Sequence, residues 1–266
     1  CILALFLLFR RVKSMKIQGG KPFSGRALGE ICTVAVPSVL QQSFISVGNL
    51  FIQYMVNGYG SSIVAGYSAA IKLNTFAITC FTTIGNGMSS FTAQNIGADK
   101  PERIRKGFRS SLFFSLGTAA VFFLLFFILS EPLLSLFMNG DSSRLAMDTG
   151  VDFLRIASPF YFIVCIKLLC DGVLRGSEAM GCFMAATFTD LILRVVLAAI
   201  FSNTMGEVRG IWLSWPGAWI AGTIMSVIFY LTGMWSRKLR KTPIAKTVEE
   251  SLEDIFEESP AEESEE

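Results

Sequence analysis

Charged side chains inside apolar stretches are the first residues of this sequence that could do chemistry. They are Lys72, Lys167, Asp171, Asp190 and Arg194. A charge in such a stretch is costly, so each is a candidate for ion coupling or ligand binding unless a neighbour neutralises it. Lys167–Asp171 and Asp190–Arg194 each lie four residues apart, so one helix can pair them, and a purely structural role stays open. Lys72 has no acid three or four residues away, and we predict that it pairs with Asp171 on another helix.

Two of these stretches also carry polar residues at helical spacing. The residues that share a face, and that we predict to line a cavity, are Gln42, Asn49 and Gln53 in the first stretch and Lys72, Thr75, Thr79 and Asn86 in the second. A polar face in an apolar surrounding must meet water or other protein. The pattern therefore predicts a substrate cavity, with hydrogen bonding between helices as the alternative.

The sequence offers little for catalysis or for a bound metal. It contains no histidine, and its six cysteines lack metal-ligand spacing. No phosphate-binding loop or nucleophile motif appears, and neither Asp171 nor Asp190 lies in the pattern of a membrane aspartyl protease. We therefore expect a protein that is not an enzyme, holds no cofactor or metal and binds no nucleic acid. A membrane enzyme is the disfavoured alternative.

Long apolar segments are the elements that must position these residues. Apolar residues make up 52% of the 266 residues, and the mean hydropathy is +0.53. Residues 31–71, 73–98, 110–130 and 210–236 contain no charge, and about 20 apolar residues suffice to span a bilayer. The sequence predicts an all-α integral membrane protein with a six-helix lobe at 31–236. The expected spans are about 31–57, 62–95, 108–137, 150–174, 182–203 and 211–235.

The flanking segments and loops differ in charge. Residues 1–12 are predicted to be the end of a truncated preceding transmembrane helix, and residues 13–30 a basic cytoplasmic loop. Residues 237–266 are predicted to be an acidic, disordered cytoplasmic tail, because ten of the 21 Asp and Glu residues lie within 249–266. Basic residues also gather between the second and third spans and after the last. Since positive loops stay cytoplasmic, we expect both chain ends in the cytoplasm.

The stretch "FTAQNIGADKPERIRKG" (91–107) is predicted to join two spans. Gln94 and Asn95 can bond the last unpaired carbonyls of the first helix. Gly97 suits the left-handed position after a helix end, and Pro101 suits the first turn of the next helix.

Several stretches resemble, in chain order, the second half of the multidrug and toxic compound extrusion (MATE) transporter family. They are "AQNIGADKPERI", "DGVLRGSEAM", "TFTDLILRVVLA" and "GIWLSWPGAWI", within a resemblance that covers about residues 1–240. The family has twelve spans in two lobes, so the resemblance implies that this chain is the carboxyl-terminal six-helix lobe. It also implies an antiporter that exports cationic or amphipathic compounds in exchange for Na⁺ or H⁺, in the plasma membrane of a bacterium. The missing amino-terminal lobe is expected to be required for activity.

Two other functions stay open beside multidrug efflux. A flippase for lipids or lipid-linked precursors has a related fold and is the closest alternative in chemistry. A truncated gene would instead give a non-transporting scaffold. In each case the lipid bilayer is the expected partner of the chain.

Overall fold

The computed structural model describes residues 6–7, 10, 25–138 and 143–236. The chain divides into two compact units, residues 1–36 and 37–266, and the cavity and the helix contacts around it lie within the second unit. Most of the predicted helix end at 1–12 and of the basic loop at 13–30 lies outside the described residues. The predicted acidic tail at 237–266 lies wholly outside them.

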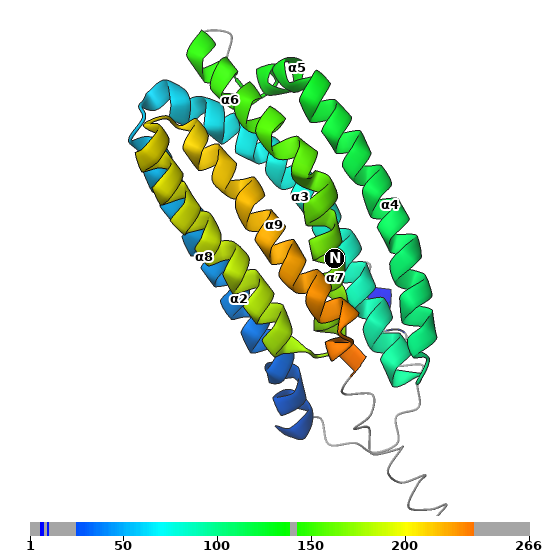
Figure 1. Cartoon of the computed structure of the whole chain (residues 1–266). Coiled ribbons are helices and arrows are strands. Elements are labelled where there is room, and N and C mark those ends of the chain that lie inside the picture. Colours follow the sequence, from blue (N-terminus) through cyan, green and yellow to red (C-terminus); the bar gives the residue numbers. More distant parts are fainter. Residues whose placement is uncertain (1–5, 8–9, 11–24, 139–142, 237–266) are drawn as a thin grey trace, which may run out of the picture. The chain divides into compact units, whose positions relative to one another are not determined.

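The described residues form helices joined by short turns, and no strand occurs among them (Figure 1). The helices are α2 (Gly25–Asn57), α3 (Ser61–Gly97), α4 (Pro101–Ile128), α5 (Ser130–Ser135), α6 (Arg144–Ala157), α7 (Tyr161–Gly176), α8 (Met180–Met205) and α9 (Arg209–Leu231), with short 3₁₀ turns at Ser158–Phe160 and Met234–Ser236. Six segments of this part of the chain are long and apolar enough to cross a membrane. The predicted all-α, six-span class is confirmed.

Prolines mark two helix breaks, near Pro132 and Pro159, that the apolar runs did not predict. The third span was expected as one helix at 108–137, but α4 begins at Pro101 and ends at Ile128, and α5 follows as a separate helix. The ring of Pro132 would clash with the carbonyl group four residues earlier, which is that of Ile128. Pro159 lies in the 3₁₀ turn between α6 and α7 in the same way. These two helices and their turn still make one candidate span, Arg144–Gly176.

The junction between α3 and α4 corrects the predicted roles of its residues. Gly97 is the last residue of α3, and Asp99 instead takes the left-handed conformation, with φ of 52°. Aspartate tolerates this conformation better than most residues do. Backbone amides beyond the helix bond its last carbonyls, while the Asn95 amide donates to the carbonyl of Phe91 (2.7 Å). Pro101 lies in the first turn of α4, as predicted.

Small residues let α3 and α7 meet at the level of their backbones. A Cβ atom added to Gly172 of α7 would collide with the carbonyl oxygen of Gly85 on α3. A Cβ atom added to Gly85 would lie 2.6 Å from the carbonyl oxygen of Leu168. Such close approach is how membrane helices gain packing energy without a hydrophobic driving force.

Aromatic side chains join α3 to α7 and α9. Tyr67 of α3 stacks on Trp212 of α9, with 4.9 Å between ring centroids. The hydroxyl of Tyr161 on α7 donates to Asn74 of α3 at 2.9 Å, deep in the protein. Helix α9 in turn packs against α7 and α8. These contacts hold α3, α7, α8 and α9 around one space, which contains the candidate site.

Candidate functional site

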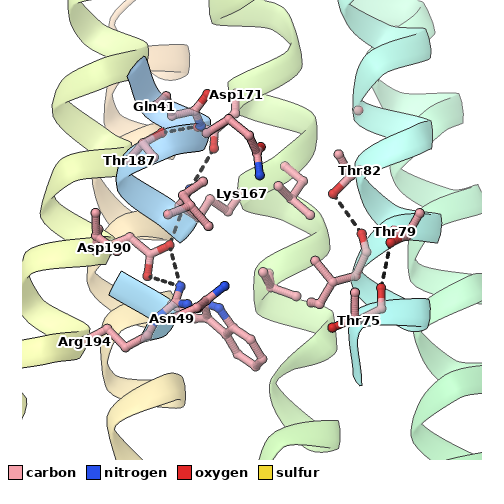
Figure 2. Close-up of a pocket in the computed structure, with 18 of the residues that line it drawn as sticks. Gln41, Asn49, Thr75, Thr79, Thr82, Lys167, Asp171, Thr187, Asp190 and Arg194 are labelled. Carbon is pink, nitrogen blue, oxygen red and sulfur yellow. Dashed lines mark hydrogen bonds and ion pairs between the residues drawn. The ribbon is translucent and has the colours of Figure 1, made fainter. Parts of the chain in front are cut away.

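A cavity of about 470 Å³ lies between α2, α3, α7, α8 and α9. Its charged wall comes from α7 and α8, and its facing wall carries the threonines of α3 (Figure 2). Helix α2 contributes amide side chains, and α9 contributes Trp215 and Trp219. The site therefore combines charges, neutral polar groups and aromatic rings at the depth of the membrane-spanning helices.

Four charged side chains form a continuous buried cluster in the charged wall. Lys167 donates to Asp171 with an Nζ–Oδ2 distance of 2.8 Å, and its Nζ lies 3.8 Å from Oδ2 of Asp190. Arg194 donates through Nη2 to both carboxylate oxygens of Asp190 at 3.3 Å. The exposed fraction is 4% for Lys167 and Asp171 and 8% for Asp190 and Arg194. At such burial an isolated charge would be strongly disfavoured, so each charge depends on the next one in the cluster.

Helical spacing and one glycine bring the cluster together. Each helix supplies an oppositely charged pair four residues apart, and α7 and α8 turn these pairs toward one another. Gly222 of α9 leaves the room for this contact, because a Cβ atom there would lie 2.8 Å from Cε of Lys167 and 3.0 Å from Cβ of Asp190.

Helix α9 also supplies uncharged partners for the cluster. The hydroxyl of Ser226 donates to Oδ1 of Asp171 at 2.6 Å, so both oxygens of that carboxylate are bonded. The guanidinium of Arg194 lies over the ring of Trp215, 4.5 Å from its centroid. A cation over an aromatic face is favourable, more so where water is excluded.

The α3 wall of the cavity is polar, but its threonine hydroxyls hydrogen-bond backbone carbonyls of α3 itself. Thr79 donates to the carbonyl of Thr75 at 2.7 Å, and Thr82 donates to that of Ile78 at 2.8 Å. Further along the wall, Asn86 accepts a hydrogen bond from Arg175 of α7. Thr75, Thr79 and Asn86 are nonetheless exposed in this chain.

Most of the residues singled out from the sequence meet in this cavity. Those that line it are Gln42, Asn49, Thr75, Thr79, Asn86, Asp171, Asp190 and Arg194. Gln53 is not part of the lining and donates to Asn57 within α2 at 2.9 Å. Lys72 is exposed and also lies outside the lining.

The predicted pair between Lys72 and Asp171 is not formed. Lys167 and Ser226 occupy both oxygens of Asp171, and among the described residues no carboxylate lies within ion-pair distance of Lys72. Lys167 lies one turn from Asp171 on the same helix, so the pair forms without any particular packing between helices. A pair between Lys72 and Asp171 would require α3 and α7 to pack so that the two side chains face each other.

Some residues of the site were missed because their partners lie on other helices. They include Gln41, which donates to Thr187 at 3.2 Å, and Arg175, Trp215 and Ser226. The sequence carried one usable signal, since Lys167, Asp171 and Arg175 recur at steps of four and so share one face of α7.

A comparison with protein families gives a match to the family model described as MatE, over residues 37–200. The match covers more than half of the chain and includes most of the cavity-lining helices. It thus falls on the part of the chain that holds the charged cluster.

Curated relatives carry transporter names. The chain is 23% identical over 206 residues to the probable multidrug resistance protein YpnP of Bacillus subtilis, covering 77% of this chain and 45% of that protein. It is 26% identical over 201 residues to the FAD transporter of Shewanella oneidensis, covering 76% and 43%. It is 22% identical over 244 residues to the probable multidrug resistance protein NorM of Thermotoga maritima, covering 88% and 50%. These names support the prediction of a transporter rather than an enzyme, and the chain spans about half the length of these relatives.

Solved structures share the fold. The chain matches an outward-facing multidrug resistance MATE family transporter with a TM-score of 0.69 and 22% identity, covering 75% of this chain and 44% of that one. It matches the MATE transporter VcmN of Vibrio cholerae in its bent form with a TM-score of 0.78 and 15% identity, covering 90% and 54%. Family model, relatives and fold agree, and the chain belongs to the MatE family of multi-pass membrane proteins.

Proposed function

We propose that this chain is the carboxyl-terminal lobe of a secondary active efflux transporter for small cationic or amphipathic compounds. The observation that carries the proposal is the cavity of about 470 Å³ between five helices, which joins buried charges, amides and tryptophans in one space. A volume of this order holds a small organic molecule. The names of the curated relatives from Bacillus subtilis and Thermotoga maritima, which are multidrug resistance proteins, support efflux as the direction of transport.

A second six-helix lobe is part of this proposal. Gln42, Asn49, Thr75, Thr79 and Asn86 are exposed in this chain, although they lie in candidate membrane spans. Polar side chains at that depth face protein or a water-filled space rather than lipid. Since the relatives are about twice as long, a second lobe covering this face is the simplest arrangement, and we expect the chain alone to be inactive.

Coupling to Na⁺ or H⁺ is assigned to the two carboxylates of the cavity, Asp171 and Asp190. They are the acids among the described lining residues, and each is held by a basic partner. A proton or a sodium ion on either carboxylate would compete with Lys167 or Arg194. Binding of the coupling ion would thereby rearrange the charged wall, which is a way for ion binding to change the affinity for substrate.

Efflux is tested with ethidium, a cationic dye, in cells that lack their own exporters. One strain expresses the chain alone, and another expresses it joined to the amino-terminal half of the Thermotoga maritima relative. We expect the joined form to lower dye accumulation, with dependence on a Na⁺ or H⁺ gradient, and the chain alone to have no effect. Efflux by the chain alone would contradict the need for a second lobe. Movement of a fluorescent lipid without movement of dye would favour the flippase.

The proposed membrane is the plasma membrane, with both chain ends on the cytoplasmic side. Cysteine labelling on a cysteine-free background tests this orientation. Gly58→Cys probes the turn between α2 and α3, and Lys100→Cys probes the turn between α3 and α4; both residues are exposed. We expect an impermeant reagent outside the cell to label the first variant and not the second. The reverse pattern would invert the topology.

A further inference from the structure

The charges that line the cavity alternate in sign but do not cancel. In order along α7 and then α8 they are Arg175, Asp171, Lys167, Asp190 and Arg194, and the described lining contains no other charged residue. Three cations therefore face two carboxylates. One cation is therefore left without a carboxylate of its own. Because the signs alternate, this cation is either Arg175 or Arg194, and the contacts of each side chain show which.

The paired end of the series is Arg194. Its guanidinium bonds both oxygens of Asp190 and lies over Trp215, at 8% exposure. Asp171 is likewise satisfied, because Lys167 and Ser226 bond its two oxygens at 2.8 and 2.6 Å. Four of the five charges thus form two neutral pairs in contact with each other.

The hydrogen-bond partners of Arg175 are neutral, and Asp171, one helical turn away, acts on it only at longer range. Arg175 donates through Nη2 to Oδ1 of Asn86 and through Nε to the hydroxyl of Ser89 at 3.5 Å, and it lies 5.7 Å from the ring centroid of Phe183. No carboxylate among the described residues is within ion-pair distance of it. A guanidinium has five N–H donors, so donors remain after these two bonds. A partly buried arginine of this kind favours a bidentate acidic partner.

We infer that Arg175 is the binding point for an acidic group, a carboxylate or a phosphate, on the transported molecule. Phe183 and Leu168, which also line the cavity, supply apolar surface beside it for the rest of an amphipathic compound. The inference rests on the proposed function in that this cavity carries the substrate. It extends the proposed substrates, at this wall, to amphipathic molecules that bear an acidic group.

Binding of two xanthene dyes to the full chain in lipid nanodiscs tests the inference. Carboxyfluorescein is an anion and tetramethylrhodamine methyl ester is a cation, so the pair separates charge from ring stacking. Fluorescence anisotropy gives the dissociation constant of each dye. We expect the parent chain to bind carboxyfluorescein more tightly than the rhodamine ester, and equal or reversed preference would overturn the inference.

Asn86→Asp is the most informative variant, because it sets a carboxylate on Arg175 with little change in shape. It should weaken carboxyfluorescein binding about tenfold or more, as expected for loss of a charged hydrogen-bonded partner, and should not weaken binding of the rhodamine ester. Arg175→Gln should show the same selective loss, and Arg175→Lys a smaller one. The matched control is Arg109→Gln, an exposed arginine of α4 outside the cavity, which should change neither constant.

Two results separate failure of this inference from failure of the proposed function. Equal loss of both dyes in Arg175→Gln and Asn86→Asp would show a structural role for Arg175 and overturn the inference, whether or not dye is exported. Selective binding of the anionic dye, in a protein that moves no compound across a membrane, would instead support the binding site and contradict efflux. If Asn86→Asp does not give monodisperse protein, the dye preference of the parent and of Arg175→Gln decides.

Discussion

The two facing walls of the cavity are polar in different ways. On the charged wall, Lys167, Asp171, Asp190 and Arg194 are buried and satisfy one another across α7 and α8. On the α3 wall, threonine hydroxyls bond the carbonyl one turn back and the side chains stay exposed. Removing one residue of the charged wall leaves its buried partner unpaired. Removing a threonine hydroxyl of the α3 wall leaves the hydrogen bonds of the helix backbone intact. The charged wall should therefore dominate stability, and the α3 wall should affect what the cavity binds.

The largest expected effect comes from breaking the charged wall at Asp171. Asp171→Ala leaves Lys167 buried without its closest partner, which should lower the free energy of unfolding by about 3–5 kcal/mol. The measurement is the amount of monodisperse protein after heating, by size-exclusion chromatography in detergent. Lys167→Met combined with Asp171→Leu removes both charges and should recover most of the loss. A double variant no more stable than the single one would show that the pair is not the cause.

A steric change behind the charged wall should have the next largest effect. Gly222→Ala places a methyl group against Lys167 and Asp190, and such overpacking costs about 1–3 kcal/mol. Gly117→Ala on α4 is the matched control, because nothing lies within 4 Å of its added Cβ atom. The control should be neutral or slightly stabilising, since alanine is the better helix former. Equal thermal stability of the two variants would contradict the packing described for α9.

The α3 wall should show the opposite balance between stability and transport. Thr79→Val removes a hydroxyl that bonds only its own helix among the described contacts, so the free energy of unfolding should change by about 0.5 kcal/mol or less. Transport of a compound that contacts this hydroxyl should fall about two- to tenfold, the value of one neutral hydrogen bond. Thr118→Val on α4, whose hydroxyl bonds the Phe114 carbonyl outside the cavity, is the control. Equal transport by both variants would remove Thr79 from the substrate path.

Lys72 should give the smallest effect on stability. It is exposed and has no described ion pair, so Lys72→Gln should change the free energy of unfolding by about 0.5 kcal/mol or less. A double-mutant cycle with Asp171→Asn should show no coupling above about 0.5 kcal/mol. Coupling well above that value would mean that the two residues meet in another state of the protein, as their sequence pattern predicted.

Local chemistry made much of this structure predictable. Long apolar runs, four of them free of charge, predicted the spans, and spacing of four predicted the Lys167–Asp171 and Asp190–Arg194 pairs, since both depend only on the geometry of one helix. Contacts between helices were not accessible in this way. The 3.8 Å approach of Lys167 to Asp190 and the bond from Ser226 depend on how α7, α8 and α9 pack.

Two errors have the same origin as those missed contacts. Lys72 drew attention because no acid was near it in sequence, but exposure is a property of the folded chain that no local pattern reports. At the end of α3, glycine was expected in the left-handed position because it has no Cβ atom. The helix continued through Gly97, and Asp99 accepted that conformation instead.

The contact between Gly85 and Gly172 has a mechanical consequence. Where two backbones touch, no side chain between the helices can change rotamer to let them slide or roll, so we expect α3 and α7 to move together. Helix α2 is attached to α8 through side chains, including Gln41 on Thr187 and Phe44 on Phe188, and Tyr59 in the turn after α2 bonds Ser202. Side chains can change rotamer and exchange partners at little cost. We therefore expect the width of the cavity to depend on the tilt of α2 more than on the spacing between α3 and α7.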